Sequence, residues 1–326
     1  MHPIRAASFV HTAIRPLAAV SGWPVLPSDL VLDRVVGIGE DSRGFFYLAH
    51  RGDRPLLRLN PDGTLNAEIG AQHMRRTTAY DLRGPTPIPI ATRYWMHGLY
   101  LDACDNLWVT EVGRHVVWKF SPDGELLATL GTDGVAGADA THFNQPTHVC
   151  VNPAGDIFVT DGYGNSRVVH FNAGGEFISE WGSRGTAPGQ FHTPHTITRD
   201  ADGRLYVADR ENDRIQVFTE SGEVLAVWEG LHSIDGLFAA ADGFLYASSG
   251  IDNAVLQLDR SGKIINVWIP PGGFRYPHGV ACGRDGSLYV AETGDIWRVT
   301  GPKPEDRFSI ERHGPAGSNA QKLRLC

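Results

Sequence analysis

The sequence has few cysteines and no long hydrophobic stretch. No uncharged apolar run approaches the roughly 18 residues that a membrane helix needs. His11 and Arg15 interrupt the apolar residues near the N-terminus, so we expect neither a membrane association nor an export signal. The cysteines are too far apart to form a Cys-x-x-Cys pair or to indicate a disulfide framework, which favours a reducing compartment, and we expect a cytoplasmic protein. They are Cys104, Cys150, Cys282 and Cys326.

An excess of basic charge is also missing. The chain has 29 Lys and Arg residues against 37 Asp and Glu residues, which gives a formal net charge of −8. Proteins that bind nucleic acids neutralise phosphates with a surplus of Lys and Arg, so no nucleic acid partner is expected. Glycine and proline are abundant, with 38 and 20 residues, whereas charged residues make up only 20%. This composition favours many short elements joined by tight turns over long helices.

A short apolar strand recurs six times along the chain. Each copy follows a turn rich in Gly, Asp or Asn, and the first five copies are followed by a further strand and a second turn. The copies are Phe46–Leu48, Leu107–Val109, Ile157–Val159, Leu205–Val207, Leu245–Ala247 and Leu288–Val290. Their spacing of roughly 40 to 60 residues is typical of four-stranded propeller blades. The sequence therefore predicts an all-β fold, a six-bladed β-propeller, over residues 36–303. An N-terminal arm (1–35) and a C-terminal tail (304–326) remain, and either could supply the strand that closes the last blade.

One repeat position contains three histidines. The residue ten positions before each apolar copy is expected at the start of the innermost strand of its blade, where side chains face the central channel. These residues are Val36, His97, Thr147, His195, Asp235 and His278. Because His97, His195 and His278 fall in alternate blades, they should converge on the axis as a set of three nitrogens that suits zinc. The alternative is three channel histidines with structural hydrogen bonds. The other histidines, including His148 and His192, are expected in surface or turn roles.

A second repeat position contains two arginines. Arg51 and Arg210 each lie five residues after the start of an apolar copy, in blades one and four, which face each other across the axis. Paired guanidinium groups beside a metal suggest a small carboxylate ligand, because each presents a fixed fork that matches two oxygens. The alternative is ordinary salt bridges at the rim, with neighbours such as Asp53 or Asp209.

Blade three places a tyrosine next to this second position. Tyr163 lies in the segment TDGYGNSR, where flanking glycines allow a tight turn beside the channel. A phenol near a divalent cation and guanidinium groups has a stabilised phenolate and can act as a base. The alternative is a packing role. No Ser-His-Asp elbow, phosphate loop or dinucleotide fingerprint is present.

The repeats, of which PHGVACGRDGSLYVAET is an example, resemble NHL repeats, and the whole set resembles the peptidyl-α-hydroxyglycine α-amidating lyase family. The stretches that carry the second resemblance include MHGLYLDACDNLWVTEVGRHVVWKF, DGYGNSR, ADREN and YPHGVACGRDGSLYV. The resemblance implies that His97, His195 and His278 bind zinc. It also implies that Tyr163 is the proposed base, and that Arg51 and Arg210 serve the substrate and the tyrosine.

The chain departs from this family at several positions. The secreted animal enzymes have cysteines where this chain has Asn144, Gly164, Tyr206 and Val217, so both members of each family disulfide are absent together. The aspartate that binds the family's structural calcium is Gly279 here, which does not favour a calcium ion. The family methionine at the substrate wall is Tyr276, so substrate preference is expected to differ.

The resemblance implies a zinc-dependent lyase. Such an enzyme cleaves the C–N bond of an N-acyl-α-hydroxyglycine, a peptide or small-molecule amidoglycolate, and gives glyoxylate and a primary amide. Two alternatives stay open: a lyase that acts on a small ureidoglycolate-like substrate, and a non-catalytic NHL propeller that serves as an interaction platform. A lactonase-like propeller is disfavoured, because it would gather Glu, Asp and Asn around calcium, and the channel position offers only Asp235.

Overall fold

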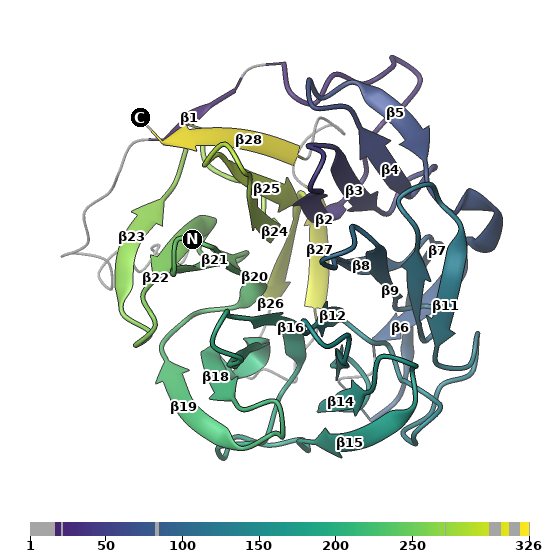
Figure 1. Cartoon of the computed structure of the whole chain (residues 1–326), viewed down its shortest axis with the longest axis vertical. Helices are drawn as coiled ribbons and strands as arrows, with labels where there is room; N and C mark the ends of the chain where they lie inside the picture. The colour runs from purple at the N-terminus through teal and green to yellow at the C-terminus, as the bar shows by residue number, and fades with distance from the viewer. Residues whose placement is uncertain are drawn as a thin grey trace.

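The protein forms a ring of antiparallel β-sheets around a central axis (Figure 1). The structure, a computed structural model, describes residues 17–20, 22–81, 85–270, 272–299, 308–312 and 320–325. Within these ranges there are six four-stranded sheets and two two-stranded sheets. The helical elements described are two short 3-10 turns, η2 (Ala71–His73) and η3 (Arg210–Asn212). No described helix combines the length and the apolar character needed to cross a membrane.

Five of the four-stranded sheets are each built from four consecutive strands, and the innermost strand comes first. Blade one contains β2 (Val35–Glu40), β3 (Phe46–His50), β4 (Leu56–Leu59) and β5 (Leu65–Glu68). Blade two contains β8 (Met96–Leu101), β9 (Leu107–Glu111), β10 (Val116–Phe120) and β11 (Leu126–Leu130). Blade three contains β12 (His148–Val151), β13 (Ile157–Asp161), β14 (Arg167–Phe171) and β15 (Phe177–Trp181). Blade four contains β16 (Pro194–Arg199), β17 (Leu205–Asp209), β18 (Arg214–Phe218) and β19 (Val224–Glu229). Blade five contains β20 (Ile234–Ala239), β21 (Leu245–Ser249), β22 (Ala254–Leu258) and β23 (Ile264–Trp268).

The remaining four-stranded sheet is assembled from both ends of the chain. Its inner strands are β24 (Pro277–Cys282) and β25 (Leu288–Glu292), and its outer strands are β28 (Ala320–Leu325) and β1 (Leu17–Ala19), in the order β24-β25-β28-β1. All of these neighbours are antiparallel. Two further strands, β26 (Asp295–Val299) and β27 (Phe308–Arg312), form a separate hairpin.

The predicted all-β propeller is confirmed, but the predicted number of six blades is wrong: within the described residues, five blades are formed by four consecutive strands each, and the remaining sheet is assembled from both ends of the chain. The apolar copies mark the second strand of each sheet, so they cannot reveal where the outer strands come from. Both terminal segments contribute to the last sheet, although the sequence left open which one would. The predicted boundary at residue 303 and Cys326 lie outside the described residues.

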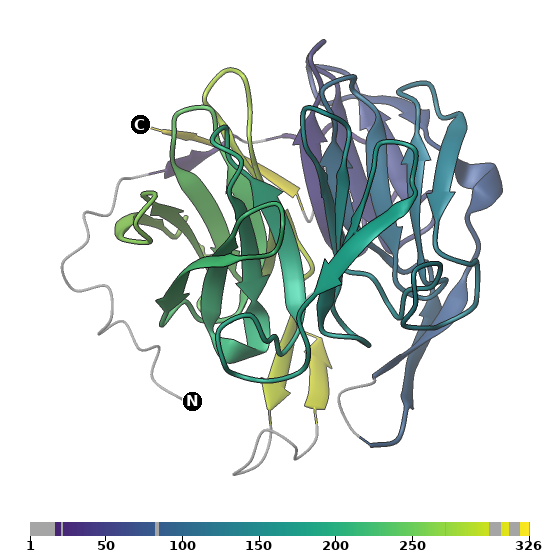
Figure 2. The ribbon, with the colours of Figure 1, turned by 60° about the horizontal axis from the view of Figure 1, so that its bottom comes forward.

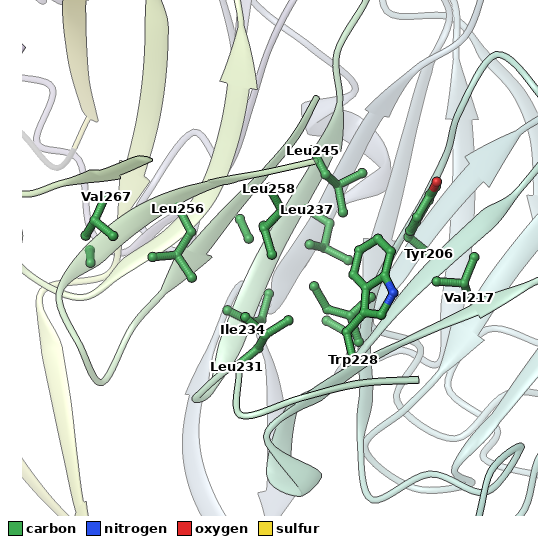
Figure 3. Close-up of a cluster of buried hydrophobic side chains, with 14 residues drawn as sticks. Tyr206, Val217, Trp228, Leu231, Ile234, Leu237, Leu245, Leu256, Leu258 and Val267 are labelled. Atoms are coloured by element: carbon green, nitrogen blue, oxygen red, sulfur yellow. The ribbon is translucent and has the colours of Figure 1, made fainter. Parts of the chain in front are cut away.

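The blades are held together by apolar side chains packed between neighbouring sheets. Figure 3 shows one such cluster, in which Tyr206, Val217 and Trp228 of blade four meet Leu245 and Leu256 of blade five, among other residues. Burying one side chain of this size contributes about 1.5–3 kcal/mol. The clusters between blades make the ring rigid, so residues at the inner ends of the strands are fixed relative to one another.

A repeated hydrogen bond fixes the chain just before the inner strand in four sheets. The last residue of the second strand is a carboxylate that accepts a backbone N–H one or two residues before the inner strand, or four residues before it in blade three. The pairs are Glu111 with Trp95 (2.7 Å), Asp161 with Asn144 (2.8 Å), Asp209 with His192 (2.7 Å) and Glu292 with Arg275 (2.7 Å). Hydrogen bonds to a charged acceptor are stronger than neutral ones. They anchor the chain next to the strand ends where the three histidines lie.

Two hairpins project from one face of the ring (Figure 2, blue and yellow, at the bottom). One is β26–β27. The other is formed by β6 (Thr77–Asp81) and β7 (Ile88–Arg93), which pair with each other between blades one and two. The repeat pattern does not predict either hairpin.

Candidate metal centre

Three imidazole rings meet at the axis of the propeller. His97 lies in β8, His195 in β16 and His278 in β24, and their ring centroids are 4.6, 4.9 and 5.0 Å apart. None of the three is more than 6% exposed, and one ligand atom of each lies within 4.8 Å of the other two. The structure therefore brings together the three histidines that the repeat position singled out.

The ring Nδ1 atoms of the triad have backbone partners. They lie 2.7 Å from the Thr147 carbonyl oxygen, 2.7 Å from that of Asp235 and 2.9 Å from that of Val36. A carbonyl oxygen only accepts, so each Nδ1 carries a proton and each Nε2 has its lone pair available. The three acceptors occupy the same repeat position in the neighbouring blades. The fold thus sets the tautomer that a metal ligand needs.

The environment keeps these imidazoles neutral. Burial is the largest cause that lowers the pKa of all three, and it lowers the pKa of His278 to about 3. Nearby positive charge contributes to this shift in the same direction, because Arg51 and Arg210 also lower the pKa of His278. Metal ions bind neutral imidazole, so the site needs little deprotonation before it can bind an ion.

Tyr163 reaches the same point from the loop after β13. Its hydroxyl oxygen lies 2.8 Å from His97 Nε2 and 3.1 Å from His195 Nε2. A phenol has one proton and can donate to only one of these two nitrogens. The Nε2 atoms therefore keep lone-pair capacity that a metal ion at this point could accept. Three neutral imidazole nitrogens fit a zinc-class ion.

The glycines that flank Tyr163 are required for close packing. A Cβ at Gly162 would lie 2.1 Å from the Pro194 carbonyl oxygen, and a Cβ at Gly164 would lie 2.2 Å from Asn144 Cγ. Neither glycine has a left-handed φ. The reason for these glycines is therefore close packing and not the predicted turn geometry: blade four approaches Gly162, and the segment before β12 of the same blade approaches Gly164.

The two arginines lie beside the triad in different surroundings. Arg51 Nε donates to the Met96 carbonyl oxygen at 3.1 Å, and its guanidinium carbon is 4.9 Å from the centre of the Trp95 ring. Arg210 lies 5.5 Å above the Tyr163 ring. It is paired with Asp235 (3.1 Å) and with Glu211 (2.6 Å). Asp209, the alternative partner considered for Arg210, pairs instead with Arg214 at 2.7 Å.

Asp235 is a site residue whose contacts the sequence did not indicate. Its carboxylate accepts the Gly250 N–H at 3.2 Å and lies 3.8 Å from His195 Nε2. Burial raises the pKa of Asp235 to about 7, against the opposing effect of Arg210. The only sequence signal was its place at the repeat position of the histidines, which says nothing about its partners.

Tyr276 forms a wall next to Asp235. Its backbone is left-handed (φ 58°), and its N–H donates to Asn253 Oδ1 at 2.9 Å. A Cβ at Gly250 would lie 2.3 Å from the Tyr276 ring, so only glycine leaves room for it. Burial, followed by the charge of Asp235, raises the pKa of the Tyr276 phenol. The residue is 6% exposed, and Asp235 and Arg210 lie close enough to act on the charge of its phenol.

The chain is similar in sequence to several known proteins. The NHL repeat family matches residues 143–171 and 191–218. The chain is 38% identical to the peptidylglycine alpha-amidating monooxygenase of Rattus norvegicus, over 93% of this chain and 33% of that protein. It is 31% identical to NHL repeat-containing protein 3 of Homo sapiens, with 84% and 80% covered. It is 28% identical to a probable peptidyl-alpha-hydroxyglycine alpha-amidating lyase of Caenorhabditis elegans, with 80% of each covered. The chain belongs to the family of NHL-repeat proteins that includes NHL repeat-containing protein 3, and its relatives also include peptidyl-alpha-hydroxyglycine alpha-amidating lyases.

The extent of these matches differs between relatives. The chain spans about a third of the length of the curated monooxygenases that it matches. The lyases named in the family are carbon–nitrogen lyases. Among solved structures, a streptogramin B lyase superposes with a TM-score of 0.61 at 17% identity, over 95% of this chain and 97% of that chain, which supports the propeller fold.

The positions of the family cysteines are adjacent in pairs. Gly164 N–H donates to the Asn144 carbonyl oxygen at 2.9 Å, and Tyr206 faces Val217 across β17 and β18. Both absent pairs are therefore neighbours in space, as the resemblance implies. The described cysteines, Cys104, Cys150 and Cys282, are free thiols.

Gly279 lies in β24 directly after His278. Gly279 offers no carboxylate, and a Cβ there would lie 2.9 Å from the Val36 carbonyl oxygen.

A cavity of about 290 Å³ lies along the inner strands next to the triad, and His148 lines it. The expected surface or turn role of His148 is therefore wrong: it directly follows the repeat position, and the residues that do so in other sheets, Gly37, Thr196, Gly236 and Gly279, line the same cavity. His50 and His170 are buried as well, contrary to the same expectation.

Proposed function

We propose that the protein is a zinc-dependent lyase that cleaves the C–N bond of an N-acyl-α-hydroxyglycine. The products are glyoxylate and a primary amide. The observation that carries the proposal is the convergence of three neutral imidazole nitrogens on one point that the Tyr163 hydroxyl also reaches. The names of the amidating lyases in the family support the same reaction class.

The ion would be held by His97, His195 and His278. When bound, zinc supplies a Lewis acid that favours ionisation of an alcohol and stabilises the negative charge. The protein's own contribution is the fixed tautomer of each ligand and a dry, rigid site. Three backbone carbonyls provide the tautomer, and the packed blades provide the rigidity.

Tyr163 would act as the base. In its phenolate form it accepts the proton of the substrate's α-hydroxyl, the oxygen forms a carbonyl with the α-carbon, and the C–N bond breaks with its electron pair going to nitrogen. The Tyr163 phenol then returns that proton to the departing amide nitrogen, so protons and electron pairs balance and no oxidant is consumed. General-base catalysis of this kind is typically worth about 10²- to 10⁴-fold in rate.

Arg51 and Arg210 would bind the substrate carboxylate, and Tyr276 would limit the space beside it. A guanidinium fork matches the two oxygens of a carboxylate, and both arginines act on the charge of the triad. Arg210 is already oriented by Asp235 and Glu211, which leaves its position fixed before substrate arrives.

The deciding experiment is glyoxylate release from a panel of amidoglycolates by the purified protein, with and without a chelator. The panel contains a peptidyl-α-hydroxyglycine, a small N-acyl-α-hydroxyglycine and ureidoglycolate. We expect release from at least one of them, loss of release with chelator, and recovery when zinc is added back. Stable binding of about one zinc ion without any glyoxylate release would favour a non-catalytic NHL platform. A cytoplasmic location is part of the proposal and is checked by cell fractionation.

A further inference from the structure

The β6–β7 hairpin touches the site through a small buried cluster. Ala79 of β6 packs in this cluster together with Trp95 and Val112, and Tyr163 and Ala91 of β7 lie against it. The hairpin is not part of any blade. The hairpin therefore adjoins the site, because its cluster packs against Tyr163 and the Tyr163 hydroxyl reaches the triad.

Trp95 joins this hairpin to blade two. Its indole Nε1–H is shared between the backbone oxygens of Thr77 in β6 (3.0 Å) and Ala91 in β7 (3.1 Å). Its backbone N–H donates to the buried Glu111 carboxylate at 2.7 Å, and its carbonyl accepts the Val112 N–H at 3.0 Å. The side chain is almost fully buried. The two bonds to Nε1 fix the orientation of the indole ring, and the two backbone bonds fix the segment that carries it.

Two guanidinium groups lie against the Trp95 ring. Their carbons are 4.9 Å (Arg51) and 5.2 Å (Arg93) from the ring centre. Arg51 also donates to the carbonyl of Met96, the residue between Trp95 and His97. Two consecutive residues next to a triad histidine therefore hold Arg51. A guanidinium group over an indole face is attracted by the ring and keeps a preferred plane.

We propose that Trp95 is a positioning residue that aims the Arg51 guanidinium at the substrate carboxylate, and that the β6–β7 hairpin fixes the Trp95 ring for this purpose. The proposal rests on the lyase function above. It adds a residue and a structural element that neither the repeats nor the family resemblance point to.

A double-mutant cycle tests the proposal. Trp95→Leu keeps apolar bulk and removes both the π face and the Nε1–H. The KM for an amidoglycolate should rise about five- to thirty-fold, with kcat changed less than about twofold and zinc content unchanged. In an Arg51→Ala background, the same change should leave KM unaltered, because the group that Trp95 positions is absent. Trp95→Phe retains a smaller π face and should recover part of the affinity.

Trp118 provides a matched control in the same blade. It is as buried as Trp95, and the guanidinium carbon of Arg114 lies 4.9 Å from its ring centre. Trp118→Leu should lower the melting temperature without changing KM. This separates a loss of packing from a loss of positioning.

Equal KM values for the wild type and Trp95→Leu would overturn the proposal, as would an equal rise with and without Arg51. If Trp95→Leu does not fold, Trp95→Phe decides by the same criteria. Failure of the proposed function has a different signature, because the wild type would then release glyoxylate from no substrate. In that case, glyoxylate binding is measured by calorimetry on zinc-loaded protein. Weaker binding by Trp95→Leu and not by Trp118→Leu supports positioning, and absent or equal binding overturns it.

Discussion

The inner strands of alternate blades use the same position in different ways. In blades two and four and in the composite sheet, the position has His97, His195 and His278, whose side chains meet at the axis. In blades one, three and five, the residues are Val36, Thr147 and Asp235, whose backbone carbonyls face the Nδ1 atoms of the histidines next to them. One half of the ring supplies candidate metal ligands, and the other half sets the tautomer of their imidazoles. The half with the histidines depends on residue type, whereas the half with the carbonyls depends only on the fold.

Removing one ligand should give the largest effect. His195→Ala leaves two imidazoles, and we expect loss of bound zinc and of activity together, measured by elemental analysis and glyoxylate release. The control is His192→Ala, three residues upstream. His192 Nε2 lies near Arg184, and its backbone N–H bond to Asp209 survives the substitution, so zinc and activity should be retained. Full activity in metal-free protein would contradict the assignment.

Tyr163→Phe tests whether the Tyr163 hydroxyl takes part in catalysis beside the three histidines or whether the residue only packs there. The ring remains in its cluster, so folding and zinc content should be retained. Turnover should fall about 10²- to 10⁴-fold, with little change in KM. A variant with nearly wild-type turnover would refute the role of base and direct attention to Asp235.

Arg210→Lys tests the pairing of Arg210, which directly follows β17 in blade four, with Asp235 of blade five. Lysine keeps the charge but cannot bind Asp235, Glu211 and a carboxylate with one planar fork. Substrate binding should weaken about ten- to a hundredfold, the range expected for lost charged hydrogen bonds. Unchanged kinetic constants would show that Arg210 does not bind the carboxylate. The same substitution at Arg51 should have an effect of similar size.

The smallest predicted effect concerns stability and pH. His50 ends β3, where four other sheets have a carboxylate. Its Nε2 lies 2.9 Å from the Arg54 carbonyl oxygen, and its Nδ1 accepts the Gly52 N–H at 3.2 Å. Burial lowers the pKa of His50 to about 4, against about 6.5 in the unfolded chain. Between these values the unfolded state binds more protons, so stability falls as the pH decreases.

Urea unfolding at two pH values measures this contribution. From about pH 7.5 to about pH 5.5, the free energy of unfolding should fall about 1 kcal/mol more in the wild type than in His50→Gln. The variant keeps a donor and an acceptor but does not titrate. Equal pH dependence in the two proteins would show that His50 is not held in its neutral form.

Several site residues could be predicted because the blade repeat converts positions in the chain into positions around a ring. Counting from the apolar copies gave His97, His195, His278, Arg51, Arg210 and Tyr163 without any knowledge of contacts. The same counting failed at the last sheet, because β28 and β1 come from outside the repeat. It also failed for His148, which directly follows the repeat position and lines the channel.

The sequence alone therefore determined the fold class, the blade that carries each histidine and the kinds of side chain at the axis. These depend on local strand and turn signals that recur along the chain. Only the tertiary structure decided how the ring closes, which carbonyls hold the imidazoles, and how Trp95 and Asp235 hold the two arginines. The bond from His278 to Val36 joins residues 242 positions apart. Such contacts depend on the packing of whole blades, and no local pattern in the chain encodes them.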